Sequence, residues 1–386
     1  MLDFNSKSKA FITCKDRSVE YLEKEVRELG FVPNYVMRTG LEINASMEEC
    51  MDLNLHLRTA SHVLYEIKSF YLRSAQDIYR RIKAIPWEEY LDVDGYFSVN
   101  SVVDNDSVTT PLIVNVKVKD AIVDRFRDKF GRRPDSGSDF SGLVFQLFWK
   151  GNQARMYINT SGETLAKHGY RKIPGKAPMM EALAAATIYA TEWNTRVPFI
   201  NPMCGSGTLA IEAALMATKR FPGLFREDYA FQHLLGYDSE AYKAKKRKLE
   251  NKIEEIPELV IVASDISLQA ISYAQENAKV AGVDHVIDFQ VCDFAETEIP
   301  EKPRGVIMFN PEYGDRLGLD DELQEVYKRM GDFMKQKCAG YRGYIFTGNL
   351  ALAKKVGLKA SRRMEFWNGT IDCRLLKYDL YEGKRS

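Results

Sequence analysis

The 386-residue chain has few cysteines and histidines and no long apolar run. Its six cysteines are scattered without a C-x-x-C pair, and its five histidines show no H-x-x-x-H spacing. A disulfide framework and a zinc site are therefore disfavoured, and a metal centre has no support in the sequence. No apolar stretch approaches the roughly 18–20 residues that a membrane helix needs, which argues against a membrane-spanning segment.

The chain also lacks an excess of either charge. Its 54 Lys and Arg balance 54 Asp and Glu, so a nucleic-acid partner would have to be held by local basic patches. The first residues, MLDFNSKSKAFITC, lack the apolar core of a signal peptide. The scattered cysteines and the lack of a signal-peptide core indicate a reducing cytoplasm. The length of the chain indicates more than one domain.

The first 165 residues alternate short apolar segments with amphipathic helices and predict an α+β region. Apolar residues on one face predict a helix over 19–29, and Ser46 with Glu49 forms a capping box that opens the next one. The segment 112–118, LIVNVKV, is predicted as a strand. Because this region shows no catalytic constellation, we interpret it as a binding module.

From about residue 175 the pattern changes to apolar strands separated by helices, which predicts a parallel sheet covered on both faces. The last segment, MEFWNGTIDCRLLKYDLY, contains an Asn368-Gly369 turn and predicts an antiparallel hairpin. A parallel sheet closed by a reversed terminal hairpin is the strand plan of the class I (Rossmann-like) methyltransferase fold, an α/β fold.

A glycine turn lies between the first predicted strand and its helix, in FINPMCGSGTLA. It fits the G-x-G-x-x-A dinucleotide fingerprint, but the acid expected about 20 residues later is missing, and no Gly-Lys-Ser/Thr follows for a P-loop. S-adenosyl-L-methionine needs no phosphate cradle, so this cofactor fits the turn better. The candidate cofactor-binding residues here are Asn201, Pro202, Gly205, Gly207 and Thr208.

Two carboxylates end the next two predicted strands. Asp265 ends the second strand, where a carboxylate can accept both ribose hydroxyl protons, and Asp293 ends the third, where it can accept from the adenine amino group. Either acid alone could instead cap the helix that follows it. Their occurrence at successive strand ends favours the cofactor interpretation.

The sequence FNPEYG, residues 309–314, follows the fourth predicted strand and resembles the N-P-P-Y motif of methyltransferases that act on exocyclic amines of nucleobases. The Asn310 side-chain oxygen and the Pro311 carbonyl can accept both amine hydrogens, which aims the nitrogen lone pair at the sulfonium methyl group. Tyr313 can stack on an extruded base. We therefore predict that Asn310, Pro311 and Tyr313 are catalytic and that Asn310 also lies beside the cofactor.

Four further stretches resemble THUMP-containing RNA methyltransferases, and the bacterial group that forms N2-methylguanosine in 23S ribosomal RNA fits best. They are LHLRTASHVLYEI, DAIVDRFRDKFGRRPD, KHGYRKIPGKAPMMEALAAATI and FPGLFREDYAFQ. The resemblance implies a ferredoxin-like segment at 1–44, a THUMP RNA-binding domain at 45–160 and an S-adenosylmethionine-dependent methyltransferase domain at 161–386.

The resemblance implies transfer of methyl to the N2 amine of a guanine in large-subunit ribosomal RNA, as bare RNA or in a pre-ribosomal particle. Two alternatives remain open: adenine-N6 methylation, and an RNA-binding assembly factor whose catalytic loop has decayed. Three basic runs, at 125–133, 167–176 and 243–248, are candidates for phosphate contacts.

Two positions depart from the family pattern. The family usually has Asp where this chain has Asn201, and Pro where it has Glu312. The first change removes a carboxylate that would face the positive charges of the cofactor. Because the ends of strands one and four should be neighbours, we hypothesise that Glu312 supplies the missing carboxylate.

Overall fold

In the computed structural model of the chain, the described residues are 2–72, 75–105, 110–175, 178–313 and 321–381. They form two compact units that alternate along the sequence. The first unit comprises Met1–Cys14, Leu22–Leu165 and Arg226–Lys248. The second unit comprises Lys15–Tyr21, Ala166–Phe225 and Leu249–Ser386.

The first unit is built on an eight-stranded sheet with the order β2-β3-β1-β4-β8-β7-β5-β6. Its strands are β1 (Ser8–Cys14), β2 (Tyr35–Met37), β3 (Gly40–Ala45), β4 (Ala60–Tyr71), β5 (Tyr96–Asp104), β6 (Asp135–Gly137), β7 (Leu143–Lys150) and β8 (Gln153–Asn159). β4 pairs antiparallel with both β1 and β8, so the sheet runs without a break from the N-terminal strands to β8.

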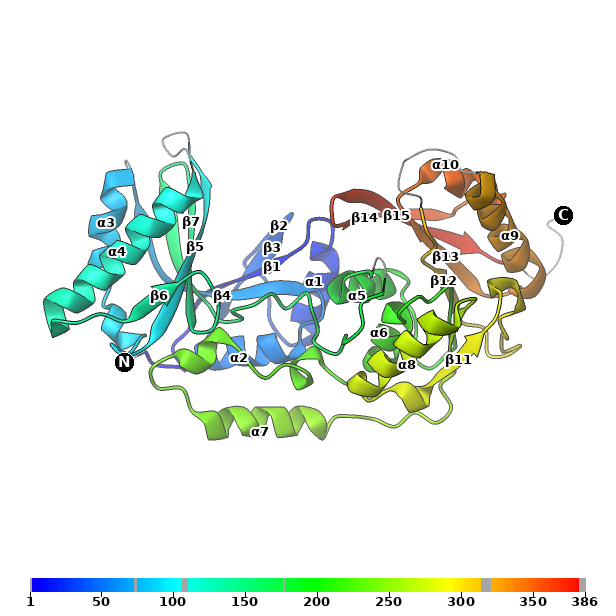
Figure 1. The fold of residues 1–386 in the computed structure, drawn as a ribbon, viewed down its shortest axis with the longest axis horizontal. Coiled ribbons are helices and arrows are strands. Elements are labelled where there is room, and N and C mark those ends of the chain that lie inside the picture. Colours follow the sequence, from blue (N-terminus) through cyan, green and yellow to red (C-terminus); the bar gives the residue numbers. More distant parts are fainter. Residues whose placement is uncertain (1, 73–74, 106–109, 176–177, 314–320, 382–386) are drawn as a thin grey trace. The chain divides into compact units, whose positions relative to one another are not determined.

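The helices of the first unit follow the predicted α+β pattern (Figure 1). They are α2 (Met47–His56), α3 (Ala75–Lys83) and α4 (Pro111–Phe130). In addition, α1 (Val19–Glu28) begins in the second unit and ends in the first, and all but the last two residues of α7 (Ser239–Glu250) belong to the first. The capping box of α2 is confirmed: Glu49 N donates to Ser46 Oγ at 3.2 Å, and Ser46 N donates to Glu49 Oε2 at 2.7 Å.

One predicted strand is wrong, because residues 112–118 lie inside α4. Thr110 caps this helix, its side-chain oxygen accepting the amide two residues later at 3.2 Å. Pro111 occupies the first helical position, where its missing N–H costs nothing and its fixed φ suits the helix. The Thr-Pro pair was thus a helix-start signal that the apolar composition of the segment concealed.

The second unit contains a seven-stranded sheet with the order β11-β10-β9-β12-β13-β15-β14. Its strands are β9 (Phe199–Pro202), β10 (Ile261–Asp265), β11 (Ile287–Val291), β12 (Val306–Phe309), β13 (Arg342–Thr347), β14 (Arg362–Asn368) and β15 (Ile371–Asp379). β9 to β13 pair in parallel, whereas β15 is antiparallel to both β13 and β14. The predicted class I methyltransferase sheet, and with it the α/β fold class, is confirmed.

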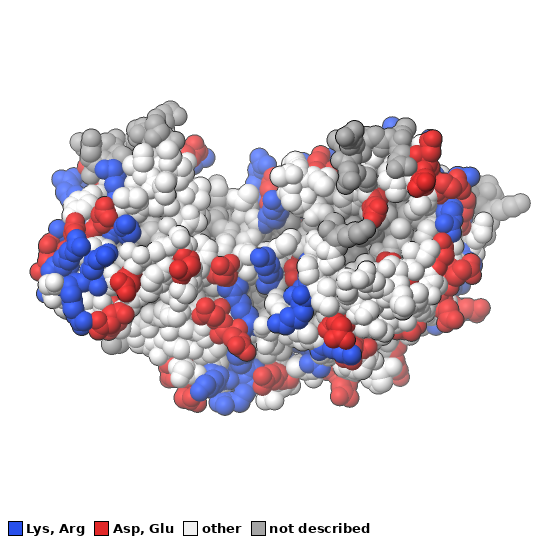
Figure 2. All heavy atoms as spheres, in the orientation of Figure 1, with Lys and Arg blue, Asp and Glu red and all other residues white. Residues whose placement is uncertain are grey.

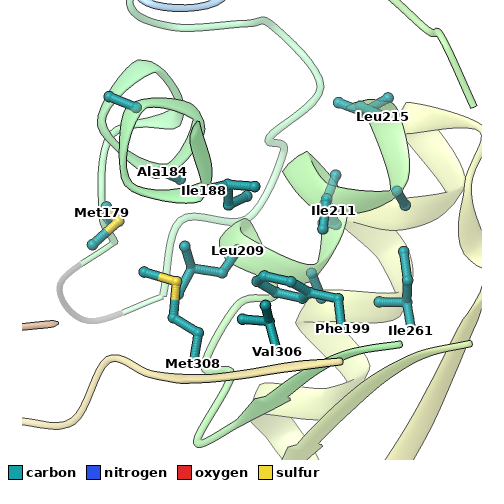
Figure 3. Close-up of a cluster of buried hydrophobic side chains, with 14 of the residues drawn as sticks. Met179, Ala184, Ile188, Phe199, Leu209, Ile211, Leu215, Ile261, Val306 and Met308 are labelled. Carbon is teal, nitrogen blue, oxygen red and sulfur yellow. The ribbon is translucent and has the colours of Figure 1, made fainter. Parts of the chain in front are cut away.

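Helices cover both faces of this second sheet (Figure 1). They are α5 (Glu181–Ala190), α6 (Thr208–Ala217), α8 (Leu268–Ala281), α9 (Asp321–Lys337) and α10 (Leu350–Ala353). Adjacent residues of β9 point to opposite faces. Phe199 packs with side chains of α5 and α6, such as Leu209 (Figure 3), and Ile200 packs in a second cluster with Tyr327 and Met330 of α9.

A buried polar pair links α6 to the segment that leads into α5. His168 Nδ1 and Glu212 Oε1 are 2.7 Å apart, and both side chains are fully buried. Glu212 lies in the second turn of α6, the helix that begins directly after the glycine turn. The pair therefore helps to hold α6, and with it the start of the candidate site.

We expect His168→Leu to lower the free energy of unfolding of the second unit by about 3 kcal/mol, because it leaves a buried acceptor without its partner. Urea denaturation would measure the loss. Lys279→Ala, which breaks the exposed Lys279–Glu276 pair, is the control and should cost less than about 1 kcal/mol. Equal losses from the two variants would show that the buried pair does not stabilise the unit.

Candidate active site

The predicted glycine turn connects β9 to α6 in a tight left-handed path. Gly205 has φ +55° and Gly207 has φ +84°, values that glycine adopts without strain. A Cβ on Gly207 would lie 2.8 Å from the Cβ of Ala274 in α8, whereas a Cβ on Gly205 would meet nothing within 4 Å. Gly207 thus permits the close approach of α6 to α8, and Gly205 leaves open space beside the turn.

Asp265, the last residue of β10, is joined to this turn. Its Oδ2 accepts a hydrogen bond from Gly205 N at 3.0 Å, and its Oδ1 accepts one from Ser267 N at 2.9 Å. Ser267, not Asp265, is the residue that caps α8. Since a carboxylate offers about four lone-pair sites, Asp265 can fix the turn and still accept further hydrogen bonds.

Asn201 in β9 is 1% exposed and carries an unsatisfied acceptor. Its Nδ2 donates to the Met308 carbonyl of β12 at 2.9 Å, while its Oδ1 is buried and has no hydrogen-bond partner among the described residues. A buried acceptor without a donor is costly. A donor bound at this end of the sheet would satisfy it. Pro202 and Thr208, which flank the turn, are buried as well.

Asp293 follows β11 and does cap the short 3-10 turn Phe294–Glu296, as the alternative interpretation allowed. Its Oδ1 accepts from Ala295 N at 2.9 Å and from Arg329 Nη2 at 2.7 Å. Burial alone would raise the pKa of this carboxyl, but these two hydrogen bonds outweigh burial and hold the pKa below its usual range. Asp293 is therefore ionised at neutral pH.

Apolar side chains that the sequence analysis did not single out lie beside both acids. Ile266 directly follows Asp265 and is 74% exposed, Leu268 is 72% exposed, and Val291 at the end of β11 is 49% exposed. Large apolar groups exposed next to strand-end carboxylates offer contact area to a flat apolar ligand. The signal in the sequence was their position within three residues of the acids.

The Asn310–Tyr313 loop follows β12, which pairs directly with β9. Tyr313 Oη donates to Asn310 Oδ1 at 3.3 Å, and its ring packs edge-on against Phe346 with the centroids 6.4 Å apart. Burial raises the pKa of the Tyr313 phenol, which therefore stays protonated. Pro311 is buried and Glu312 is exposed. The last residue of the motif, at position 314, lies outside the described residues.

Asn277 of α8 is a structural anchor that the sequence analysis missed. It is 1% exposed. Its Oδ1 accepts from Lys172 N at 2.9 Å and Ile173 N at 3.1 Å, and its Nδ2 donates to the carbonyls of Ile173 at 2.9 Å and Ser206 at 3.2 Å. One buried amide thus ties the segment before α5 to the glycine turn. Arg171 adds a hydrogen bond to Thr208 Oγ1 at 3.1 Å.

The basic run at 125–133 is largely paired with acids of the first unit. Arg125 and Lys129 both contact Glu88, at 2.7 and 2.8 Å. Figure 2 shows Lys and Arg interspersed with Asp and Glu around α3 and α4. Charges that are already neutralised contribute less to phosphate binding. This run is therefore a weaker candidate for an RNA contact than the sequence suggested.

The other two basic runs are also partly engaged within their units. In 243–248, Lys245 contacts Asp52 at 2.8 Å and Glu48 at 3.1 Å. In 167–176, Arg171 is nearly buried, and the last residue of the run lies outside the described residues. Several residues that were predicted to contact phosphate thus form ion pairs within their own unit instead.

The described part of the chain offers neither a metal centre nor a membrane-spanning helix. No group of three or more His, Cys, Asp or Glu there could hold a metal ion. None of its helices combines the length and the hydropathy needed to cross a membrane.

The sequence matches three family models that together cover most of its length. The model described as the RMKL-like methyltransferase domain matches residues 168–377. The chain belongs to the RMKL-like methyltransferase family. A THUMP domain model matches residues 73–159, and a ferredoxin-like domain model matches residues 9–64. The predicted family is confirmed, while the domain boundaries at 44/45 and 160/161 stay predictions.

Relatives in this family share sequence along nearly the whole chain. A ribosomal RNA large subunit methyltransferase K/L of Syntrophotalea carbinolica is 32% identical over 97% of this chain and 54% of its own length, so the chain spans about half of that relative. A putative RNA methyltransferase of Synechocystis sp. is 30% identical over 98% of both chains. A solved putative methyltransferase complexed with SAH (S-adenosylhomocysteine) has a TM-score of 0.87 at 26% identity, covering 98% of this chain and 99% of its own. Membership of this family supports S-adenosylmethionine as the cofactor.

The two turn glycines form a matched pair for testing the approach of α6 to α8. Gly207→Ala should destabilise the second unit by about 3 kcal/mol, because left-handed strain adds to overlap with Ala274. Gly205→Ala should cost about 1 kcal/mol, since it adds strain alone. Urea denaturation of both variants would measure the difference. The close approach would not be a constraint if both variants lost the same stability.

Proposed function

We propose that the chain is an S-adenosylmethionine-dependent RNA methyltransferase that acts on the exocyclic N2 amine of guanine in large-subunit ribosomal RNA. The observation that carries the proposal is that the Asn310–Tyr313 loop and the glycine turn follow two directly paired strands, β12 and β9. The THUMP match and the name of the Synechocystis relative support RNA as the substrate, and the name of the Syntrophotalea relative supports large-subunit ribosomal RNA. Such a substrate would place the protein in the cytoplasm.

The residues at the strand ends fit this cofactor. Gly205 leaves open space beside the turn, and the unsatisfied Oδ1 of Asn201 could accept from the cofactor ammonium group. Asp265 would accept the ribose hydroxyls, Asp293 would accept the adenine amine, and Ile266 would cover the adenine ring. Both carboxylates keep lone pairs for these roles, because their contacts with the protein use only part of their capacity.

The bound cofactor would supply a methyl group activated by its sulfonium. The task of the protein is to present a poor nucleophile, since the lone pair of a base amine is delocalised into the ring. Asn310 Oδ1 and the Pro311 carbonyl would accept the two amine hydrogens and hold the nitrogen lone pair toward the methyl group. Methyl transfer to this nitrogen would break the bond between the methyl group and sulfur and leave a neutral thioether. The nitrogen would then carry the positive charge and lose a proton to solvent. Tyr313 would support the extruded base with its ring.

The two departures from the family pattern leave this arrangement possible. Asn201 keeps an acceptor oxygen where the family has a carboxylate, although without the negative charge. Glu312 is exposed, and its backbone carbonyl accepts from Tyr327 Oη at 3.4 Å. Whether the Glu312 carboxylate compensates for Asn201 stays a prediction.

We expect Asp265→Ala to weaken S-adenosylmethionine binding by about 1.5–3 kcal/mol, the range for hydrogen bonds to a charged group. Isothermal titration calorimetry measures the effect. Asp288→Ala removes an exposed carboxylate from neighbouring β11 and should leave the affinity unchanged. If both variants bound the cofactor as the unmodified chain does, Asp265 would not belong to the ribose site.

The target atom can be identified from the methylated product. We expect the chain, incubated with methyl-labelled cofactor and unmodified 23S ribosomal RNA, to yield N2-methylguanosine on nucleoside analysis by mass spectrometry. Asn310→Ala should abolish the product while cofactor binding persists. Pre-ribosomal particles offered in place of bare RNA would show which form is the better substrate.

Other products would decide between the alternatives. N6-methyladenosine would replace guanine N2 by adenine N6 as the target, since the same loop can hold either amine. Cofactor binding without methyl transfer to RNA or particles would favour the decayed assembly factor and overturn the catalytic proposal.

A further inference from the structure

We infer that Asn368, at the end of the terminal hairpin, is a positioning residue that sets the orientation of the Asn310 side chain through the Tyr313 hydroxyl. The inference rests on the proposed function, because it concerns the residue that would accept the target amine. The Asn368-Gly369 pair in the sequence predicts only a turn.

The hairpin geometry leaves the Asn368 side chain available for this task. Asn368 is the last residue of β14 and pairs with Ile371, so the two-residue loop is formed by Gly369 and Thr370. Gly369 takes the left-handed conformation, with φ +61°. Asn368 Nδ2 instead donates a hydrogen bond to Tyr313 Oη at 3.1 Å.

The direction of these hydrogen bonds selects one orientation of Asn310. The phenol has a single proton. Because Tyr313 Oη accepts from Asn368, its own proton is free to go to Asn310 Oδ1, 3.3 Å away. An Asn310 amide turned by half a rotation would point a second donor at Oη and leave the phenol proton only the Cys373 sulfur, a weak acceptor. The arrangement therefore keeps an oxygen, not an NH2 group, on this side of Asn310.

The hairpin end is itself held in place. The Arg17 guanidinium lies 4.6 Å from the centroid of the Trp367 ring, and Arg17 also forms an ion pair with Asp372. At Gly348 a Cβ would lie 2.6 Å from Ile371 Cγ2 and 3.2 Å from Tyr313 Cδ2. The absence of a side chain there allows the hairpin and the Tyr313 ring to meet.

The backbone of the catalytic loop is fixed by other residues. Asn349 Nδ2 donates to the Tyr313 carbonyl at 3.3 Å, and Tyr327 Oη donates to the Glu312 carbonyl at 3.4 Å. Loss of the Asn368 side chain should therefore leave the loop in position and change only the hydrogen bonding of the phenol. For this reason the effect should fall on kcat and not on cofactor binding.

The test compares Asn368→Ala and Asn368→Asp in chains that carry either Tyr313 or Tyr313→Phe. With Tyr313 present, Asn368→Ala should lower kcat about tenfold, the value of one hydrogen bond. Asn368→Asp should lower it further, because a carboxylate would take the phenol proton from Asn310. With Tyr313→Phe, neither substitution should have a further effect, which is the non-additivity expected of a shared network.

Three measurements separate this role from a structural one. The KM and the calorimetric Kd for S-adenosylmethionine should stay unchanged in all variants, and Thr370→Ala in the same hairpin loop should behave as the unmodified chain. In protein labelled with 15N-asparagine, Tyr313→Phe should shift the side-chain amide signals of both Asn368 and Asn310. This last measurement requires no catalytic activity.

The outcomes distinguish the two proposals. If the unmodified chain methylates RNA but Asn368→Asp matches its kcat, or if the Asn368 effects add fully to that of Tyr313→Phe, the positioning role is wrong. If the unmodified chain methylates no RNA, the proposed function fails. The amide signals then decide the Asn368 inference alone, and an unshifted Asn310 signal in Tyr313→Phe would overturn it.

Discussion

At Gly207 the first turn of α6 lies so near α8 that a side-chain carbon would fall 2.8 Å from Ala274. That contact fixes where α6 begins. It also brings the preceding residues within reach of two polar anchors: Gly205 N reaches the Asp265 carboxylate, and the Ser206 carbonyl reaches Asn277. The turn is thus held from the end of β10 and from the side of α8, and the space beside Gly205 stays open because no side chain occupies it.

Features that depend on neighbouring residues in the sequence could be predicted. The alternation of apolar strands and helices gave the second sheet, and the Ser46–Glu49 spacing gave the start of α2. The error at 112–118 has a local cause as well. The β-branched residues there favour a strand, but the Thr110–Pro111 start and the buried positions along α4 outweigh that preference.

Contacts between distant residues could not be derived in this way. Asn277 bonds to residues more than 100 positions earlier, and Asn368 bonds to Tyr313 at a separation of 55. Neither asparagine has a sequence pattern that distinguishes it from a surface or turn residue. Similarly, the basic run at 125–133 looked available for phosphate because the chain gives no sign that Glu88, far away in sequence, lies against it. Such partners become visible only once the strands and helices are placed.

The exchange of segments between the two units constrains the order in which the protein can fold. Tyr229 and Phe231, made after the first unit's own strands, are buried in that unit, whereas Tyr21, made before them, stacks on Phe366 of the terminal hairpin at 5.6 Å. Domains usually fold as contiguous stretches while the chain is still being synthesised. Here the first unit includes residues 226–248, which are made after much of the second unit. The second unit includes residues 15–21, which are made before most of the first. The first unit therefore cannot be completed before residue 248 has been made, and the second cannot be completed before the terminal hairpin.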